Sequence, residues 1–387
     1  MALKEALDGV LRQAADSGEV PGVVAMITNR DGTLYEGAFG KRSLDGAAPM
    51  TLDTVGLIAS MTKAITSVAV MQLIERGQLD LDSPASRWLP ELDKAQVLEG
   101  FDAAGKPKLR APKRAITLKH LLTHTSGFAY EFVSEDIQKY QAATNTPGFI
   151  SCALDSIRLP LLFDPGERWS YGVSTDWAGR IVEAVSGQKL GEYFAQHILG
   201  PLGMKDTTFR MRADMRERLA KIHARVDGKL VPIDLEVPQQ PEFEMGGGGL
   251  YGTMGDYLKF VRMVLNRGSA QGHQLLKPET VDLMMQNHLG ELDVPTVRSA
   301  NRQFTNDMPM PPDNPQKWGL AWMINSKALP TGRPAGSLMW AGLANSYYWI
   351  DPTSGIAGVL MTQILPFADV KAMPLFLNFE FATYKNL

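Results

Sequence analysis

Apolar residues at the start of the chain recur first at helical spacing and then as two β-prone runs. From Leu3 to Ala15 the apolar side chains fall three or four positions apart, which predicts an amphipathic helix. The apolar runs 22–28 and 34–39 flank Asp31-Gly32, and an Asp-Gly pair between two such runs is typical of a β-hairpin. This order favours an antiparallel sheet over the alternating strands and helices of a Rossmann fold.

The other end of the chain has a related pattern. The runs 347–351 and 355–362 are β-prone and lie on either side of a Pro-containing turn, and residues 378–384 could form a closing helix. We therefore expect strands from both ends of the chain to form one antiparallel sheet flanked by helices. This is a fold of the α/β class, of α+β type.

Helical patterns dominate the middle of the chain. Residues 62–76 form a strongly apolar helix that Gly77 would end, and Ser174 is the expected cap of a later helix. A chain of 387 residues is too long for one ordinary core, at roughly 100–200 residues per domain. We expect a discontinuous α/β domain of residues 1–82 and 236–387. A mainly helical domain of residues 83–235, with few strands, would be inserted into it.

Composition and charge narrow the choice of partner and compartment. The 39 basic and 42 acidic side chains give a net charge of −3 without a basic run, which argues against nucleic acid. The single cysteine, Cys152, cannot form an internal disulfide. Charged residues interrupt the first twenty positions, and no apolar stretch reaches the ~20 residues of a membrane helix. We expect a soluble cytoplasmic protein acting on a small molecule, with no membrane contact, and leave a homo-oligomer open.

The first candidate for chemistry opens the apolar helix, where Ser60 and Lys63 are three positions apart. Residues so spaced share one helix face, so the lysine amine can reach the serine hydroxyl and activate it as a nucleophile. The amine must be uncharged to act as a base, which burial and the helix amino terminus both favour. The structural alternative is a helix cap at Ser60 and a surface lysine.

The same pattern recurs at Ser186 and Lys189, so it is not specific by itself. Ser186 falls at the end of its expected helix, where the helix dipole favours a charged lysine. Ser60 falls at the start of an apolar helix. Context therefore favours Ser60 as the nucleophile.

Two later segments offer groups that such a pair would need. Tyr171 lies on an expected tight loop and could relay protons, although a loop tyrosine more often packs against the core. Gly342, between Trp340 and Leu343, would let the backbone approach a ligand, and a strand-edge N–H there could stabilise an oxyanion. An ordinary turn into a strand is the alternative for the second segment.

These three segments, in this order and at these separations, resemble the serine β-lactamases and penicillin-binding proteins. More narrowly, the chain resembles the family VIII carboxylesterases, which share the class C β-lactamase fold. The resemblance covers nearly the whole chain. It also rests on the segments HLLTHTSG at 120–127, GQLDLD at 77–82, PLGM at 201–204 and the glycine run 246–249.

The resemblance implies a role for each candidate residue and a β-lactamase-like fold. Ser60 would be the nucleophile, Lys63 the general base and Tyr171 a second base or proton relay. The backbone N–H groups of Ser60 and Leu343 would form the oxyanion hole, and Trp340 would line the site. No metal and no cofactor are implied.

Two departures from the β-lactamase pattern change the expected substrate. The Tyr-x-Asn motif ends here in Val173, and the Lys-Thr-Gly motif reads Trp340-Ala341-Gly342. Since nothing at these positions pairs a substrate charge, a neutral hydrophobic ester is favoured over a β-lactam. We expect Val173, Trp340 and Gly342 to contact the substrate, with Tyr130 as a further pocket wall or a core aromatic.

The expected reaction is hydrolysis of short-chain or aryl carboxylic esters through an acyl-serine intermediate. The alternatives are β-lactam hydrolysis, transfer of the acyl group to an alcohol, and a non-catalytic homologue that only binds a ligand. The presence of Ser60, Lys63 and Tyr171 together argues against a decayed site. Acid should inactivate the enzyme as Lys63 becomes protonated.

Three other kinds of site fit the sequence less well. His120 and His124 have a spacing that can bind zinc, but no H-E-x-x-H motif or obvious third ligand accompanies them. No G-x-S-x-G pentapeptide indicates a Ser-His-Asp esterase. Glycines 246–249 lack the Gly-Lys-Ser/Thr of a phosphate loop, and we expect them to allow close backbone packing under the site.

Overall fold

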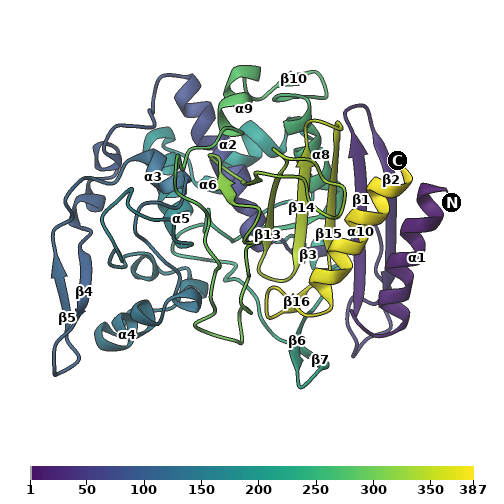
Figure 1. The fold of residues 1–387 in the computed structure, drawn as a ribbon, viewed down its shortest axis with the longest axis horizontal. Helices are drawn as coiled ribbons and strands as arrows, with labels where there is room; N and C mark the ends of the chain where they lie inside the picture. Colours follow the sequence, from purple (N-terminus) through teal and green to yellow (C-terminus); the bar gives the residue numbers. More distant parts are fainter. Residues whose placement is uncertain (1) are drawn as a thin grey trace.

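The computed structural model describes residues 2–387 and is organised around a seven-stranded antiparallel sheet (Figure 1). The strand order is β11-β12-β13-β14-β15-β1-β2, so the two ends of the chain meet where β1 pairs with β15. The expected antiparallel sheet built from both ends is confirmed. Its strands are β1 (Gly22–Asn29), β2 (Thr33–Gly40), β11 (Gln316–Trp318), β12 (Met323–Asn325), β13 (Leu338–Gly342), β14 (Ser346–Asp351) and β15 (Ile356–Met361).

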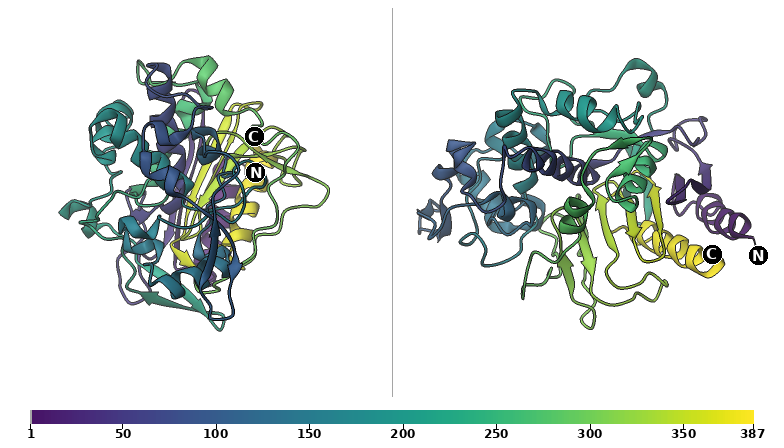
Figure 2. Two further views of the ribbon diagram at one scale, coloured as in Figure 1. Left: turned by 90° about the vertical axis from the view of Figure 1, so that its left-hand side faces the viewer. Right: turned by 90° about the horizontal axis from the view of Figure 1, so that it is seen from above.

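Helices cover both faces of this sheet (Figure 2). Along β1, Val23 and Ala25 pack with the two terminal helices, α1 and α10, whereas Val24 and Met26 face the side covered by α8. Successive side chains of a strand point to opposite faces, so a strand covered on both sides is apolar throughout. The helices concerned, with the central α2, are α1 (Leu3–Asp16), α2 (Thr62–Glu75), α8 (Met254–Leu265) and α10 (Ala372–Asn386).

Residues 83–235 contain short helices, as expected, and also four strands in two hairpins. β4 pairs with β5, β6 pairs with β7, and β16 joins β6 in parallel. These hairpin strands are partly exposed and therefore do not stand out as apolar runs. The division into two domains stays a prediction.

The remaining elements complete the chain order. In the middle they are β4 (Val97–Phe101), β5 (Pro107–Arg110), α3 (Leu118–Leu122), α4 (Glu135–Thr144), α5 (Ser174–Ser186), α6 (Leu190–Phe194), α7 (Ala213–Glu217), β6 (Ile222–Val226) and β7 (Lys229–Ile233). Elsewhere they are β3 (Val55–Leu57), β8 (Tyr251–Thr253), β9 (Ser269–Ala270), β10 (His273–Gln274), α9 (Pro278–Met284) and β16 (Ile364–Leu365). The short 3₁₀ helices are η1 (Ala59–Met61), η2 (Ala85–Arg87), η3 (Pro90–Lys94), η4 (Glu131–Val133), η5 (Phe149–Ser151) and η6 (Leu154–Ser156), and η7 (Ala195–Leu199) is a π-helical turn.

Two helix boundaries differ from those expected, each for a physical reason. The closing helix starts at Ala372, because Pro374 falls in its first turn, where a proline needs no partner for the missing N–H. Ser174 is the first residue of α5 and not its cap, so that prediction is wrong. The Ser174 hydroxyl instead hydrogen-bonds to the hydroxyl of Ser126 at 2.8 Å.

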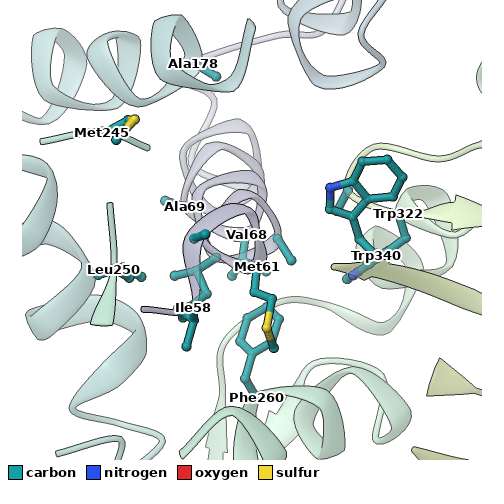
Figure 3. Close-up of a cluster of buried hydrophobic side chains, with 14 of the residues drawn as sticks. Ile58, Met61, Val68, Ala69, Ala178, Met245, Leu250, Phe260, Trp322 and Trp340 are labelled. Atoms are coloured by element: carbon teal, nitrogen blue, oxygen red, sulfur yellow. The ribbon is translucent and has the colours of Figure 1, made fainter. Parts of the chain in front are cut away.

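α2 passes through the centre of the molecule and is buried on all sides. Every residue from Thr62 to Leu73 is buried, and Val68 and Ala69 lie among side chains from α5, α8 and the segment before β8 (Figure 3). A helix that is apolar all round is stable only when other elements enclose it. Within residues 2–387, neither α2 nor any other helix is long and apolar enough to cross a membrane.

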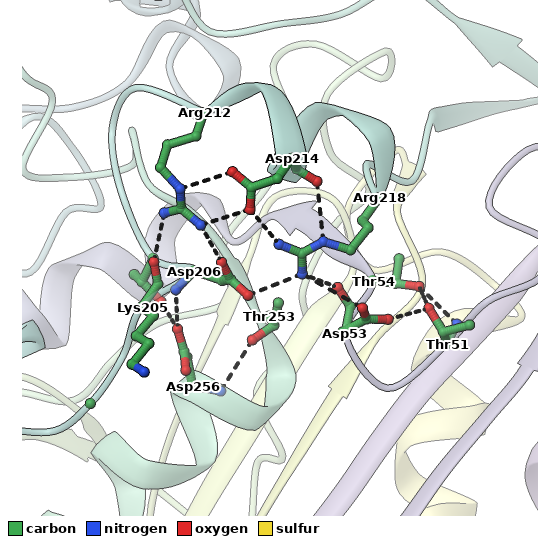
Figure 4. A network of polar contacts seen from close by, with 12 residues as sticks. Thr51, Asp53, Thr54, Lys205, Asp206, Arg212, Asp214, Arg218, Thr253 and Asp256 are labelled. Carbon is green, nitrogen blue, oxygen red and sulfur yellow. Dashed lines mark hydrogen bonds and ion pairs between the residues drawn. The ribbon is translucent and has the colours of Figure 1, made fainter.

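A network of ion pairs holds the segment that leads into α2 (Figure 4). Arg218 donates to Asp206 and Asp214, each at 3.0 Å, and to the carbonyl oxygen of Asp53 at 2.9 Å. The N–H of Asp206 donates in turn to Asp256 of α8 at 2.7 Å. Because Asp53 lies two residues before β3, the network joins three distant parts of the chain close to the start of α2.

Candidate active site

Ser60 lies on a strand-to-helix turn at the start of α2. β3 pairs with β8, and the N–H of Ile58 donates to the carbonyl oxygen of Leu250 at 3.0 Å. The backbone then turns at Ala59, whose φ of 44° falls in the left-handed region that non-glycine residues rarely adopt. Thr62 Oγ1 donates to the Ala59 carbonyl oxygen at 2.6 Å. The packed surroundings therefore enforce the kind of backbone strain that clusters at functional sites.

Lys63 points from the first turn of α2 back towards Ser60. Its Nζ lies 3.3 Å from Ser60 Oγ, and the residue is 2% exposed. Two more acceptors hold the amine, Tyr130 Oη at 3.1 Å and the carbonyl oxygen of Gly247 at 2.6 Å. An uncharged amine has two N–H donors and one lone pair. With both donors engaged by these acceptors, the lone pair is left for the proton of the Ser60 hydroxyl.

The ring of Tyr171 packs against another side of the Lys63 amine. Lys63 Nζ lies 4.7 Å from the centroid of the Tyr171 ring, and Trp340 Nε1 donates to Tyr171 Oη at 3.2 Å. His124 packs against Tyr171 at 5.2 Å between ring centroids. Burial holds the pKa of His124 well below its ordinary value, so the imidazole is neutral. The structure thus brings the expected serine, lysine and tyrosine together.

The end of β13 lies directly against the turn that carries Ser60. A Cβ on Gly342 would lie 2.3 Å from the carbonyl oxygen of Ile58, so the close approach requires glycine at this position. Leu343 follows at the end of the strand and lines the same space as Ser60. The backbone at 342–343 and the serine therefore face one another.

Tyr130 contacts Lys63 directly, which is a closer role than the pocket wall expected from the sequence. Its hydroxyl accepts from Lys63 and donates to Asp176 Oδ2 at 3.3 Å, while the N–H of Gly247 donates to Asp176 Oδ1 at 2.8 Å. Burial raises the pKa of Asp176 to about 6, against the opposing effects of Lys63 and of the Gly247 N–H. Sequence reasoning missed Asp176, because an acidic residue in the first turn of a helix is common.

Two residues singled out in the sequence lie elsewhere. Val173 is fully buried directly before α5 and lines neither of the hollows beside Ser60, so the expected substrate contact is not supported. Ser186 Oγ donates to the carbonyl oxygen of Val182 at 2.6 Å, within its own helix. The second serine–lysine pattern is therefore part of a helix end.

Two hollows open from Ser60, and apolar side chains line most of both. Ser60, Phe132 and Leu343 line both hollows. The tyrosine hollow is also lined by Tyr171, Trp340, Val297, Met308 and Phe367. The methionine hollow is also lined by Tyr130, Phe149, Ile150, Val237 and Met245. Loops without a motif supply many of these side chains, which is why the sequence did not indicate them.

The two histidines with zinc-like spacing, His120 and His124, make separate structural contacts. His120 Nδ1 accepts from the N–H of Thr117 at 3.1 Å at the start of α3, whereas His124 packs behind Tyr171. In the part of the chain that the structure describes, no group of three or more His, Cys, Asp or Glu side chains is placed to hold a metal ion.

The antiparallel sheet, the buried central helix and the serine at its start define a β-lactamase-like fold, and a family model described as Beta-lactamase matches residues 7–378. The chain belongs to this family. It is 35% identical over 396 residues to monacolin J acid methylbutanoyltransferase from Aspergillus terreus, which covers 98% of this chain and 95% of that protein. It is 34% identical to lovastatin esterase from Penicillium rubens, over 93% of each chain.

Solved structures agree with these matches. Simvastatin synthase (LovD) from Aspergillus terreus, in its LovD6 mutant form, superposes with a TM-score of 0.86 at 34% identity, covering 98% of this chain and 96% of that one. The unliganded LovD structure gives a TM-score of 0.84 at 33% identity. The protein is therefore an enzyme of the superfamily of serine hydrolases and acyltransferases that form an acyl-enzyme, and it is similar to the LovD acyltransferases.

Proposed function

We propose that this enzyme is an acyltransferase. It would move a small acyl group through an acyl-Ser60 intermediate to the hydroxyl of a bulky apolar alcohol. The observation that carries the proposal is the pair of apolar hollows that meet at Ser60, since an acyl chain and an acceptor would approach the serine from two different hollows. A relative aligned over nearly the whole chain is named for methylbutanoyl transfer. This proposal places transfer ahead of the ester hydrolysis favoured by the sequence.

Acylation would begin at the serine–lysine pair. Ser60 Oγ attacks the carbonyl carbon of an ester or thioester donor while Lys63 takes the hydroxyl proton, over the 3.3 Å that separates the two atoms. The carbonyl oxygen becomes an oxyanion. The backbone N–H groups of Ser60 and Leu343 would stabilise it, a role supported by the close approach of Gly342 to the Ile58 carbonyl beside the serine.

Tyr171 would handle the proton of the leaving group and of the acceptor. The bond between the carbonyl carbon and the leaving group then breaks, and Tyr171 passes a proton to the departing alcohol or thiol. In the second half, the acceptor oxygen attacks the acyl carbon and Tyr171, which has given up its proton, takes the proton of the acceptor hydroxyl. The bond between the acyl carbon and Ser60 Oγ then breaks, and Lys63 returns its proton to Ser60 Oγ. Trp340 holds the phenol in place by donating to its oxygen at 3.2 Å.

The proposed proton transfers indicate which hollow would hold the acceptor and which would hold the acyl chain. The acceptor must reach Tyr171, so it would occupy the tyrosine hollow, and the acyl chain would occupy the methionine hollow on the Lys63 side of Ser60. Apolar walls without a paired cation favour a neutral acyl group and a neutral acceptor. This agrees with the replacement of the β-lactamase lysine by Trp340.

Ester hydrolysis is the second candidate, and a relative at 34% identity named lovastatin esterase favours it. Water would then replace the alcohol at the same acyl-enzyme. The family VIII carboxylesterase resemblance belongs to this candidate. Turnover of β-lactams ranks below both, since the site offers Trp340 where a cation would be needed for their carboxylate.

The product distribution tests the proposal. The purified enzyme is given p-nitrophenyl butyrate with and without an excess of decahydronaphthol, a bulky alicyclic alcohol, and the products are separated by mass spectrometry. We expect the new butyrate ester to exceed butyric acid when the alcohol is present. Butyric acid as the sole enzymatic product in both cases would leave hydrolysis as the function. A chain that does not release p-nitrophenol at all would refute both.

A further inference from the structure

A buried carboxylate behind the serine–lysine pair takes no part in the steps above. Asp176 accepts from the hydroxyl of Tyr130 at 3.3 Å and from the N–H of Gly247 at 2.8 Å. A Cβ on Gly247 would lie 2.6 Å from Asp176 Oδ2, so the carboxylate has this place only because residue 247 is glycine. Thr66 Oγ1 also donates to the carbonyl oxygen of Gly246, at 2.7 Å, and secures the same glycine segment from α2.

The two residues that hold Asp176 also hold Lys63. Lys63 Nζ donates to Tyr130 Oη at 3.1 Å and to the carbonyl oxygen of Gly247 at 2.6 Å. A phenol has one proton to donate. Because Tyr130 gives that proton to Asp176, its oxygen can only accept from the amine. The two N–H groups of the uncharged amine then point to Tyr130 and Gly247, and its lone pair points to Ser60.

We propose that Asp176 is a positioning residue for acyl transfer: through Tyr130 and Gly247 it orients the Lys63 amine towards Ser60. The proposal rests on the proposed function, because it takes Lys63 as the base. Protonation of the Asp176 carboxyl group would let it donate to Tyr130 and turn the phenol proton towards Lys63, so the titration of Asp176 would limit acyl transfer at acid pH.

Most other titratable groups around this pair are held neutral. Burial keeps the pKa of His124 well below its ordinary value and raises the pKa of Cys152 to about 12. Burial together with the negative charge of Asp176 raises the pKa of Tyr130 well above its ordinary value. Tyr171 faces Lys63 through its ring, at 4.7 Å. None of these side chains replaces the charge of Asp176.

Glu131 is the other carboxyl group close to the pair. Burial raises its pKa, and its Oε1 accepts from the N–H of Phe149 at 2.8 Å. It therefore holds the backbone at the start of η5 and is not among the contacts of Lys63. Burial also raises the pKa of Asp176 to about 6, which places its titration in the range of the expected acid limb of activity.

Asp176→Asn removes the charge and keeps the shape. The amide oxygen can still accept from Gly247, but the amide nitrogen would donate to Tyr130 and turn the phenol proton towards Lys63. For p-nitrophenyl butyrate hydrolysis we expect kcat to fall about 10- to 100-fold with KM changed less than about threefold. The acid limb of kcat/KM should move to lower pH by about one unit or more. A lower kcat with an unmoved acid limb would overturn the proposal.

Two control variants make the result specific. Asp351→Asn removes another fully buried carboxylate, which accepts from the N–H groups of Thr353 and Ser354 at 2.9 Å, far along the chain in a β-turn. It should lower stability and leave the acid limb in place. Glu131→Gln should also leave the limb in place. An equal shift in Glu131→Gln would remove the assignment to Asp176.

A second variant covers the case in which Asp176→Asn does not fold. Tyr130→Phe keeps the carboxylate and removes the link, so kcat should fall about tenfold or more, and an unchanged kcat would overturn the proposal. Wild-type protein serves to separate the two proposals. If it forms no acyl-Ser60 with p-nitrophenyl butyrate, the proposed function fails. If it is active and both variants keep its kcat and its pH profile, only the role of Asp176 fails.

Discussion

Ser60 and Ser186 each precede a lysine by three positions, but their surroundings differ completely. Ser60 has the amine of Lys63 at 3.3 Å, whereas Ser186 donates to the carbonyl oxygen of Val182 in the last turn of α5. The position of each serine along its helix was readable from the sequence, because helix starts and ends have local signals. The burial of Lys63 was not, since it depends on the elements that enclose α2.

The first prediction compares these two serines. Ser60→Ala should lower the rate of ester cleavage about a thousandfold or more, because the other hydroxyl on Lys63, that of Tyr130, gives its proton to Asp176 and not to the lysine. Ser186→Ala should leave the rate within about twofold. The initial rate with p-nitrophenyl butyrate and the intact mass after treatment with a fluorophosphonate check both. Equal losses in the two variants would show that Ser60 is not the nucleophile.

At the scale of elements, the site is made by the contact of η1 and α2 with the end of β13. The sequence predicted α2 and the carboxyl-terminal hairpin separately. Neither pattern indicated that the carbonyl of Ile58 and the backbone of Gly342 would lie so close that a Cβ has no room. A glycine next to a strand is common, and only the packed structure shows why this one is required.

The second prediction uses that contact. Gly342→Ala should force β13 away from Ser60 and displace the Leu343 N–H, so kcat should fall about 100-fold, with a stability loss of about 1–3 kcal/mol. Steady-state kinetics and thermal unfolding measure the two effects. Gly9→Ala on α1, where an added Cβ meets nothing within 4 Å, is the control. It should stabilise the protein by about 0.5–1 kcal/mol and leave kcat unchanged. A fully active Gly342→Ala enzyme would contradict the proposed oxyanion donor.

At the scale of the whole molecule, contacts between distant segments hold the start of α2. Arg218 joins the segment before β3 to the loop containing Asp206, and Asp206 is tied to α8 through Asp256. The hydrogen bond from Arg218 lowers the pKa of Asp206, so the network stabilises the charged form of this carboxylate. No local sequence pattern indicates such a network, since arginine and aspartate are ordinary surface residues.

The third prediction tests how much this network stabilises the fold. Arg218→Ala should lower the free energy of unfolding by about 1–2 kcal/mol, because it leaves the Asp53 carbonyl without its donor and leaves Asp206 and Asp214 with Arg212 alone. The matched control is Arg216→Ala. Its ion pair with Glu236 has both side chains more than 40% exposed, so the loss should stay below about 0.5 kcal/mol. Urea unfolding of both variants measures the two losses. Equal losses would show that the network stabilises the fold no more than the exposed ion pair of Arg216 does.

What the sequence determined by itself was local or repeated along the chain. Helical periodicity put Ser60 and Lys63 on one face, alternation and turn residues predicted the sheet strands at both ends, and the order of motifs indicated the family. The clamp of Tyr130, Asp176 and Gly247 around the lysine, and the two hollows beside the serine, were decided by tertiary structure alone. Hydrogen bonds and cavity walls between distant segments exist only once packing has placed those segments together, and a pattern read along one chain carries no record of that placement.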